Sequence, residues 1–230
     1  MPRVRLYFKG LNSFKFPKNY DDIFSSIFVS KINSFIENVF QFKNFDSYTF
    51  SGFVIEHYDG QNEEDSLYST DGIVSVVISS ISEEFLRKFV AFLVDGNNIN
   101  FQKNIMYLVR FEFIQNPDFN RGEADFICIC PLFLKNYPDN GNLFSYIENL
   151  LINDYCRYYD LNVNNVYCEI TTHGDLFKKF IDTDTPSSKF HDCFYMLDLN
   201  IVGDAGLISF AYDVGLGNDT IFGFGMLDLY

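Results

Sequence analysis

The chain has 230 residues, of which 47% are hydrophobic, and it carries 28 Phe, 15 Tyr and no Trp. This composition excludes a disordered chain, because it supplies enough apolar surface for a sizeable core. No apolar run reaches the length that a membrane span requires, so we expect no membrane partner. Five cysteines without Cys-x-x-Cys spacing and three scattered histidines predict no metal site, no cofactor and a reduced, cytoplasmic protein.

The formal net charge of −14 is distributed unevenly along the chain. Residues 1–43 carry seven basic and three acidic groups, a balance of +4, whereas the remainder carries 10 basic and 28 acidic groups, a balance of −18. Because nucleic acids are bound largely through Lys and Arg on phosphate, any nucleic acid that binds is expected to meet the N-terminal part. The acidic remainder is typical of a solvated surface that keeps a Phe-rich protein soluble.

The first predicted element is a strand that could contact RNA. Residues 4–10 alternate, with Val4, Leu6 and Phe8 on one face and basic or aromatic residues on the other. This pattern fits a sheet edge that binds RNA, and it equally fits a basic strand that only faces solvent. The basic RNA-binding candidates in this part of the chain are Arg3, Arg5, Lys9, Lys15 and Lys18.

The elements of the first half follow the order of a ferredoxin-like domain. Apolar spacing and turn residues predict a strand at 4–10, a helix at 19–40, a strand at 48–51, a hairpin tip at 59–65, a strand at 72–80, a helix at 83–95, and strands at 99–101 and 105–114. The resulting order of strand, helix, strand, strand, helix, strand over residues 1–116 predicts the ferredoxin-like arrangement.

The second half repeats this order after a polar linker at residues 116–122. Its expected elements are a strand at 125–134, a helix at 143–157, strands at 166–170 and 193–201, and a terminal helix and strand. The chain therefore predicts an α+β fold of two tandem ferredoxin-like (RRM-like) domains, at residues 1–116 and 123–230.

The end of the chain carries a glycine-rich turn between a helix and a strand. Apolar spacing over residues 204–214 predicts a helix, and Gly215 follows its last apolar position, where a residue without Cβ caps most easily. A polar turn comes next. We expect a strand after it, with Phe222, Phe224 and Met226 on one face and two alternate glycines on the other.

This stretch resembles the C-terminal signature of the CRISPR-associated precursor-crRNA-processing endoribonucleases, which belong to the RAMP superfamily. The matching residues are Gly215, Gly217, Gly223, Phe224, Gly225 and Met226. The segment from Tyr48 to Ser51 also resembles a Phe-Thr-Phe-Ser strand of that family, and Cys130-Pro131 stands where members have Ser-Pro. An ordinary helix-to-strand connection is the alternative interpretation of the glycines.

The resemblance implies that the chain binds CRISPR repeat RNA and cleaves it without metal, leaving a 2′,3′-cyclic phosphate. It also implies that the turn binds RNA, through Gly215, Gly217, Asn218, Thr220, Gly223 and Gly225. Members of the family commonly carry Lys or Arg between the second and third glycines. This chain has Asn218, Asp219 and Thr220 there, and a carboxylate repels phosphate.

The catalytic groups that the resemblance implies are not found at their usual places. Members have a Tyr in the first helix, a His near its end and a Lys before the short strand. Here those places fall near Phe28 or Val29, near Phe40, and near Asp46. The resemblance therefore implies a divergent member without the usual histidine. The replacement candidates are Lys31, Lys43 and His57, which equally fit solvated lysines and a surface histidine.

Two functions remain open at this stage. The first is a metal-independent endoribonuclease that processes CRISPR repeat RNA. The second is a non-catalytic relative that binds RNA, docks on CRISPR effector subunits, or acts as an acidic mimic that interferes with CRISPR complexes. In either case a monomer or a homodimer is expected.

Overall fold

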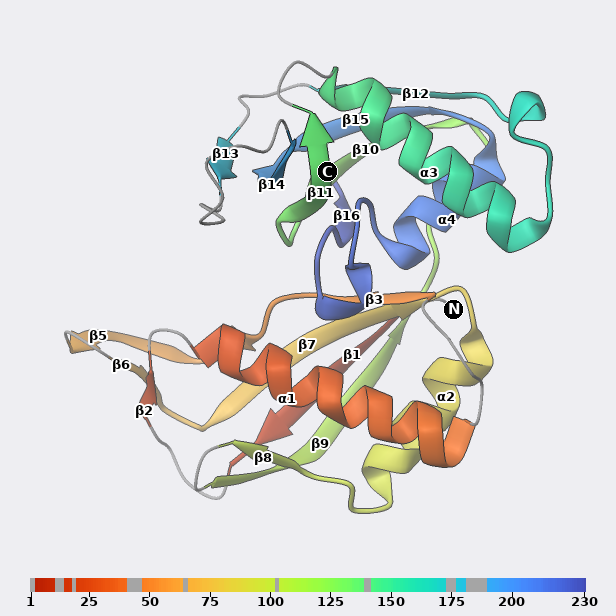
Figure 1. Cartoon of the computed structure of the whole chain (residues 1–230). Helices are drawn as coiled ribbons and strands as arrows, with labels where there is room; N and C mark the ends of the chain where they lie inside the picture. Colours follow the sequence, from red (N-terminus) through yellow and green to blue (C-terminus); the bar gives the residue numbers. More distant parts are fainter. Residues whose placement is uncertain are drawn as a thin grey trace. The chain divides into compact units, whose positions relative to one another are not determined.

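The computed structural model describes residues 3–10, 15–17, 20–40, 47–63, 66–101, 104–138, 142–172, 177–180 and 190–230 (Figure 1). The chain divides into two compact units, Met1–Asn116 and Pro117–Tyr230. Among the described helices, none combines the length and the hydropathy that crossing a membrane would require.

The first unit is built on one antiparallel sheet with the strand order β3-β7-β1-β9-β8, in which β4 also pairs with β7. A second sheet has the order β2-β6-β5. The elements are β1 (Arg3–Lys9), β2 (Lys15–Pro17), α1 (Tyr20–Phe35), a π-helical turn (Ile36–Phe40), β3 (Tyr48–Phe50), β4 (Val54–Ile55), β5 (Tyr58–Glu63), β6 (Ser66–Ser69), β7 (Ile73–Ser80), α2 (Glu83–Val94), β8 (Ile99–Phe101) and β9 (Asn104–Ile114).

The second unit contains a sheet with the order β12-β15-β10-β16 and another with the order β11-β14-β13. Its elements are β10 (Glu123–Cys128), β11 (Leu132–Pro138), α3 (Leu143–Tyr159), a 3-10 turn (Val163–Asn165), β12 (Cys168–Thr172), β13 (Phe177–Phe180), β14 (Phe190–Met196), β15 (Asp198–Gly203), α4 (Ala205–Val214), a 3-10 turn (Thr220–Phe222) and β16 (Leu227–Leu229).

Both units have the ferredoxin-like topology, which confirms the predicted fold class. Along the chain the first unit runs β1-α1-β3-β7-α2-β9 and the second runs β10-α3-β12-β15-α4-β16. In each sheet the second strand of this series lies at one edge, followed by the third, the first and the fourth. The first strand of each unit is therefore central, with a partner on both sides.

Both helices of the first unit lie against its sheet (Figure 1), and phenylalanine rings pack between them. The fully buried ring of Phe28, on α1, lies 6.4 Å from Phe8 on β1, 5.2 Å from Phe50 on β3 and 5.7 Å from Phe89 on α2, measured between ring centroids. Edge-to-face pairs of this kind add to the stabilisation from burial. Phe28 is thus a core residue, which explains why no polar side chain stands at this position.

Replacing Phe28 with tyrosine, the residue that the resemblance implies near this place, is expected to destabilise the first unit by about 1–3 kcal/mol, because the new hydroxyl enters an apolar core without a partner. Phe111→Tyr is the matched control, since that ring is 43% exposed on β9 and its hydroxyl would reach water. Denaturant titration measures both variants, and equal stabilities would show that the core accommodates the hydroxyl.

Several expected strands are shorter than the sequence suggested. The strand expected at 125–134 is interrupted between β10 and β11, where Pro131 lacks an amide hydrogen for a ladder bond. The strand expected at 193–201 is likewise divided at Leu197 between β14 and β15, which belong to different sheets. In both cases the chain changes sheet within an apolar run, and periodicity alone does not reveal such a change.

Candidate functional site

The sheet of the first unit displays basic and aromatic side chains on the face opposite its helices. Val4, Leu6 and Phe8 are buried on the helix side, so the alternate residues of β1 point the other way. The register of the β1–β9 pair places further residues of β9 on that side. We call this surface the β1–β9 face and define it by Arg5, Tyr7, Lys9, Tyr107, Arg110 and Glu112.

Arg110 is the best-defined cation of the β1–β9 face. Its guanidinium lies 4.8 Å from the centroid of the Tyr7 ring and forms an ion pair with Glu112. The Tyr7 hydroxyl also donates to Glu112, at 3.2 Å. The hydrogen bond to Glu112 raises the pKa of Arg110, and the same bond lowers the pKa of Glu112. The cation is therefore fixed beside an aromatic ring, an arrangement suited to base stacking and phosphate contact.

Arg110 did not emerge from the sequence because no local pattern links it to β1. Only the register shows that it lies opposite Tyr7, just before a shift in the pairing of β1 with β9. The sequence also suggested that β1 is a sheet edge, which is wrong, since β7 and β9 flank it. The flat surface offered to a ligand is thus the middle of the sheet.

The other N-terminal basic candidates differ in their surroundings. Arg5 and Lys9 are exposed on the β1–β9 face, whereas Arg3, at the beginning of the same strand, is only 2% exposed. Lys15 belongs to β2, where its backbone pairs with Tyr68. Lys18 lies outside the described residues.

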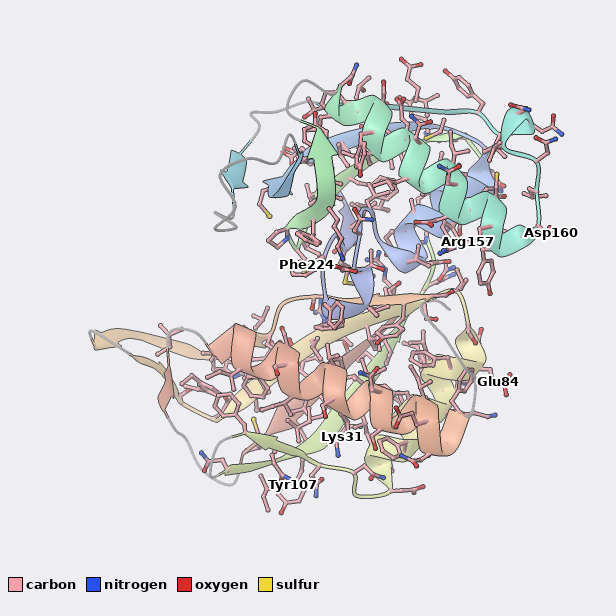
Figure 2. All side chains as sticks on the ribbon, viewed as in Figure 1. Lys31, Glu84, Tyr107, Arg157, Asp160 and Phe224 are labelled. Carbon is pink, nitrogen blue, oxygen red and sulfur yellow. The ribbon has the colours of Figure 1, made fainter. Side chains whose placement is uncertain are left out.

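The two catalytic candidates that the structure describes, Lys31 and His57, share no hydrogen bond or ion pair. Lys31 lies on α1, with its Nζ 5.9 Å from the centroid of the Phe92 ring on α2 (Figure 2). It therefore belongs to the helical side of the sheet rather than to the β1–β9 face. Lys43 lies outside the described residues. His57 stands between β4 and β5.

His57 is paired with Asp71, a residue that the sequence did not single out. The Nδ1 atom of His57 contacts Oδ2 of Asp71, while Oδ1 of the same carboxylate accepts from the amide of Ile73 at 3.0 Å and from the hydroxyl of Ser69 at 3.3 Å. Partial burial by itself raises the pKa of Asp71, but these hydrogen bonds together hold that pKa below its usual value. We call this arrangement the His57–Asp71 pair.

The glycine turn of the second unit is held by backbone hydrogen bonds. The amide of Leu216 donates to the Gly225 carbonyl at 2.9 Å, and the amide of Gly225 donates to the Pro131 carbonyl at 2.9 Å. Asn218 is bonded twice, because its amide donates to the Phe133 carbonyl at 2.8 Å and its Oδ1 accepts from the Lys135 amide at 2.9 Å.

Positive backbone angles and close approach explain two of the glycines directly. Gly225 has φ +65°, and a Cβ there would lie 1.8 Å from the carbonyl oxygen of Leu216. Gly217 has φ +88°, and its Cβ would lie 2.6 Å from the carbonyl oxygen of Phe133. A residue with a Cβ does not fit either position without movement of the backbone.

The strand expected after this turn is wrong over residues 222–226. Thr220–Phe222 forms a 3-10 turn, Gly223 follows with φ +88°, and β16 begins only at Leu227. Phe222 is 47% exposed whereas Met226 is buried, so the two do not share one strand face. Phe224 packs on Phe133, with 5.4 Å between ring centroids (Figure 2).

The cysteine side chains that the structure describes offer no reactive thiol at these surfaces. Cys128, Cys130 and Cys156 are buried and form no disulfide. Burial raises the pKa of the Cys128 and Cys168 thiols to about 12, so both are protonated and poor nucleophiles near neutral pH. Within the described part of the chain, no three side chains of His, Cys, Asp or Glu gather in a way that could hold a metal ion.

A family model described as CRISPR associated protein Cas6, C-terminal, matches residues 114–229, which is half of the chain. The chain belongs to the Cas6 family. The matched region contains the whole glycine turn, so the family predicted from those glycines is confirmed. The Cas6 match also begins close to the boundary between the two compact units.

Relatives of Cas6 type resemble the chain over its whole length. The CRISPR-associated endoribonuclease Cas6 1 of Methanocaldococcus jannaschii is 22% identical over 244 residues, covering 98% of this chain and 91% of that relative. A solved CRISPR associated protein Cas6 has a TM-score of 0.80 at 20% identity, covering 100% of this chain and 99% of its own. These similarities agree with the fold of two ferredoxin-like units.

Two further structures show the same Cas6-like fold. A Cas6-related protein from Pyrococcus furiosus has a TM-score of 0.75 at 14% identity and covers 100% of this chain and 98% of its own. A RAMP protein described as binding different RNA substrates has a TM-score of 0.74 at 18% identity, and both chains are covered completely.

Proposed function

We propose that this chain binds CRISPR repeat RNA and cuts it to crRNA in a reaction that needs no metal ion. Membership of the Cas6 family supports this proposal, and one of its relatives bears the name of a CRISPR-associated endoribonuclease. The proposed RNA surface is the β1–β9 face of the first unit. The glycine turn is a second proposed contact, made through its backbone.

The observation that carries the proposal is the composition of the β1–β9 face. Arg5, Lys9 and Arg110 are exposed there beside Tyr7, although the chain as a whole has a net charge of −14. A central sheet surface with aromatic rings and cations is the arrangement on which RRM-like domains stack bases and hold phosphates. The acidic remainder would direct RNA toward this region rather than elsewhere.

The proposed reaction is an attack of the ribose 2′-hydroxyl on the adjacent phosphorus. A bond forms between the 2′-oxygen and phosphorus while the bond from phosphorus to the 5′-oxygen breaks. The products are a 2′,3′-cyclic phosphate and a 5′-hydroxyl. Such a step is helped by a base for the 2′-hydroxyl and by cations that offset the charge developing on the phosphate oxygens.

Incubation of 5′-labelled repeat RNA with an excess of protein in EDTA tests this function. We expect one cut whose 5′ fragment changes mobility on treatment with a phosphatase only after acid has opened a cyclic phosphate. A product that forms only with added Mg²⁺ would contradict metal independence. No product after long incubation would contradict cleavage altogether.

Specific observations favour a second candidate, a Cas6 relative that binds RNA or effector subunits without cutting. Phe28 is fully buried among aromatic rings, and Phe40 contacts Phe35 and Phe85 at ring distances of 5.9 and 5.5 Å. Neither residue can transfer a proton. Binding of repeat RNA without product in the EDTA assay is the result that this candidate predicts.

A further inference from the structure

The His57–Asp71 pair is arranged as an oriented imidazole. Because the pKa of Asp71 is lowered, this carboxylate is ionised near neutral pH and can only accept hydrogen bonds. The Nδ1 atom of His57 must therefore carry the hydrogen in their contact. The remaining ring nitrogen, Nε2, is then a proton acceptor when the imidazole is neutral, and the His57 side chain is 66% exposed.

The backbone holds the carboxylate side of the pair rigidly. Asp71 is fixed by the amide of Ile73 and by Ser69, whose hydroxyl oxygen also accepts from the amide of Gly72 at 2.9 Å. The two partners are joined again through the main chain, since the amide of Thr70 donates to the carbonyl of His57 at 3.2 Å. A carboxylate held by such supporting bonds fixes the orientation of the imidazole ring that is hydrogen-bonded to it.

The pair lies at the end of the β1–β9 face. The Gly10 amide donates to the Gly72 carbonyl at 3.2 Å, which joins the end of β1 to the segment that carries Asp71. In the register, Lys9 lies opposite Ile73 on one side and opposite Tyr107 on the other. Lys9 is therefore the cation on the strand adjacent to the pair.

Among the described residues, Glu56 adds a further charged group to this corner. Its amide donates to the Ile73 carbonyl at 3.1 Å, and its carboxylate interacts electrostatically with Arg110. An RNA strand lying along the β1–β9 face would thus pass Arg110 and Lys9 and end beside the His57 imidazole. The first unit thus offers such a strand, on one surface, two cations, the Tyr7 ring and an oriented imidazole.

We propose that the His57–Asp71 pair supplies the base for RNA cleavage, with His57 as the catalytic residue and Asp71 as its positioning residue. This inference rests on the proposed endoribonuclease function. Nε2 takes the proton of the 2′-hydroxyl as the 2′-oxygen bonds to phosphorus. The bond from phosphorus to the 5′-oxygen breaks, and a water molecule protonates that oxygen. The hydroxide so formed takes the proton back from the imidazolium, so the pair is restored.

Single-turnover cleavage in EDTA, at protein concentrations that saturate the RNA, tests the role of His57. His57→Ala is expected to slow cleavage by about 100-fold or more, which is the ordinary contribution of a positioned base. Affinity for repeat RNA with a 2′-deoxy nucleotide at the mapped cut is expected to stay within about twofold. Because the site is exposed, added imidazole should restore at least about a tenth of the lost rate.

The role of Asp71 is tested by non-additivity. Asp71→Asn is expected to slow cleavage by roughly 10- to 100-fold, the usual cost of removing a carboxylate that orients an imidazole. In the double variant, Asp71→Asn should add little to the loss caused by His57→Ala, because it acts through that ring. Fully additive losses would overturn the positioning role.

Thr70→Ala is the matched control. Thr70 is exposed in the same hairpin, and its backbone bond to His57 survives the substitution. A rate equal to that of the unmodified chain is expected. If Thr70→Ala slowed cleavage as much as His57→Ala, and imidazole restored neither, the hairpin would be acting structurally and the proposal would be overturned.

Two further outcomes distinguish the base role of His57 from the proposed endoribonuclease function itself. Cleavage by His57→Ala at the unmodified rate would overturn the base while leaving the endoribonuclease function intact. A chain that binds repeat RNA but never cuts it would instead refute the proposed function.

A substrate with sulfur in place of the bridging 5′-oxygen distinguishes a catalytic base from a catalytic acid. Because sulfur leaves without protonation, recovery of His57→Ala on that substrate would overturn the base role in favour of an acid.

Discussion

Gly225→Ala is expected to lower the free energy of unfolding of the second unit by about 2–5 kcal/mol. A left-handed conformation costs an alanine roughly 1–2 kcal/mol, and forced overlap in a packed region costs roughly 1–3 kcal/mol more. Both penalties apply, because Gly225 has φ +65° and its Cβ would lie 1.8 Å from a backbone oxygen, that of Leu216. Equilibrium denaturation followed by circular dichroism measures the loss.

Gly96→Ala separates the two penalties. Gly96 has φ +91°, yet a Cβ there would meet no atom within 4 Å. It should therefore show only the conformational cost, about 1–2 kcal/mol. If Gly96→Ala and Gly225→Ala destabilised their units equally, close approach of the backbone would not be the reason for glycine at position 225.

This contrast explains why the glycine pattern identified the family so well. The glycine spacing reflects a backbone crossing, in which residues 215–217 and 223–225 pass within hydrogen-bonding distance of each other. The spacing does not predict the conformation of the segment between them. The 3-10 turn and the delayed start of β16 depend on bonds to Pro131 and Phe133, which are distant in the chain.

The helices were predictable for a local reason, whereas the site was not. Ser82 accepts from the Phe85 amide at 3.1 Å, and the apolar stripe of α2 faces the core, as capping and periodicity indicate. Arg110 became a candidate only because strand register places it opposite Tyr7, and Asp71 only because the pairing of β5 with β6 brings it to His57. Register follows from pairing between segments that lie far apart in sequence, and a local pattern does not encode it.

Removing the three cations of the β1–β9 face is expected to weaken binding of repeat RNA by about 100-fold. The triple variant Arg5→Ala, Lys9→Ala and Arg110→Ala loses three contacts to phosphate, each worth roughly 1 kcal/mol at an exposed site. Because each contact releases counterions from single-stranded RNA, the slope of log affinity against log salt should also fall by about 2. Filter binding between low and physiological salt measures both quantities.

A second triple variant removes the same charge elsewhere. Arg87, Lys88 and Arg157 are exposed on helices and form ion pairs with neighbouring acids. Their replacement by alanine changes the net charge of the chain by the same amount without touching the β1–β9 face. If binding depended only on net charge, both triple variants would lose affinity equally. A loss confined to the first variant would instead locate the RNA on one surface, the one on which cations, the Tyr7 ring and the His57–Asp71 pair lie along adjoining strands.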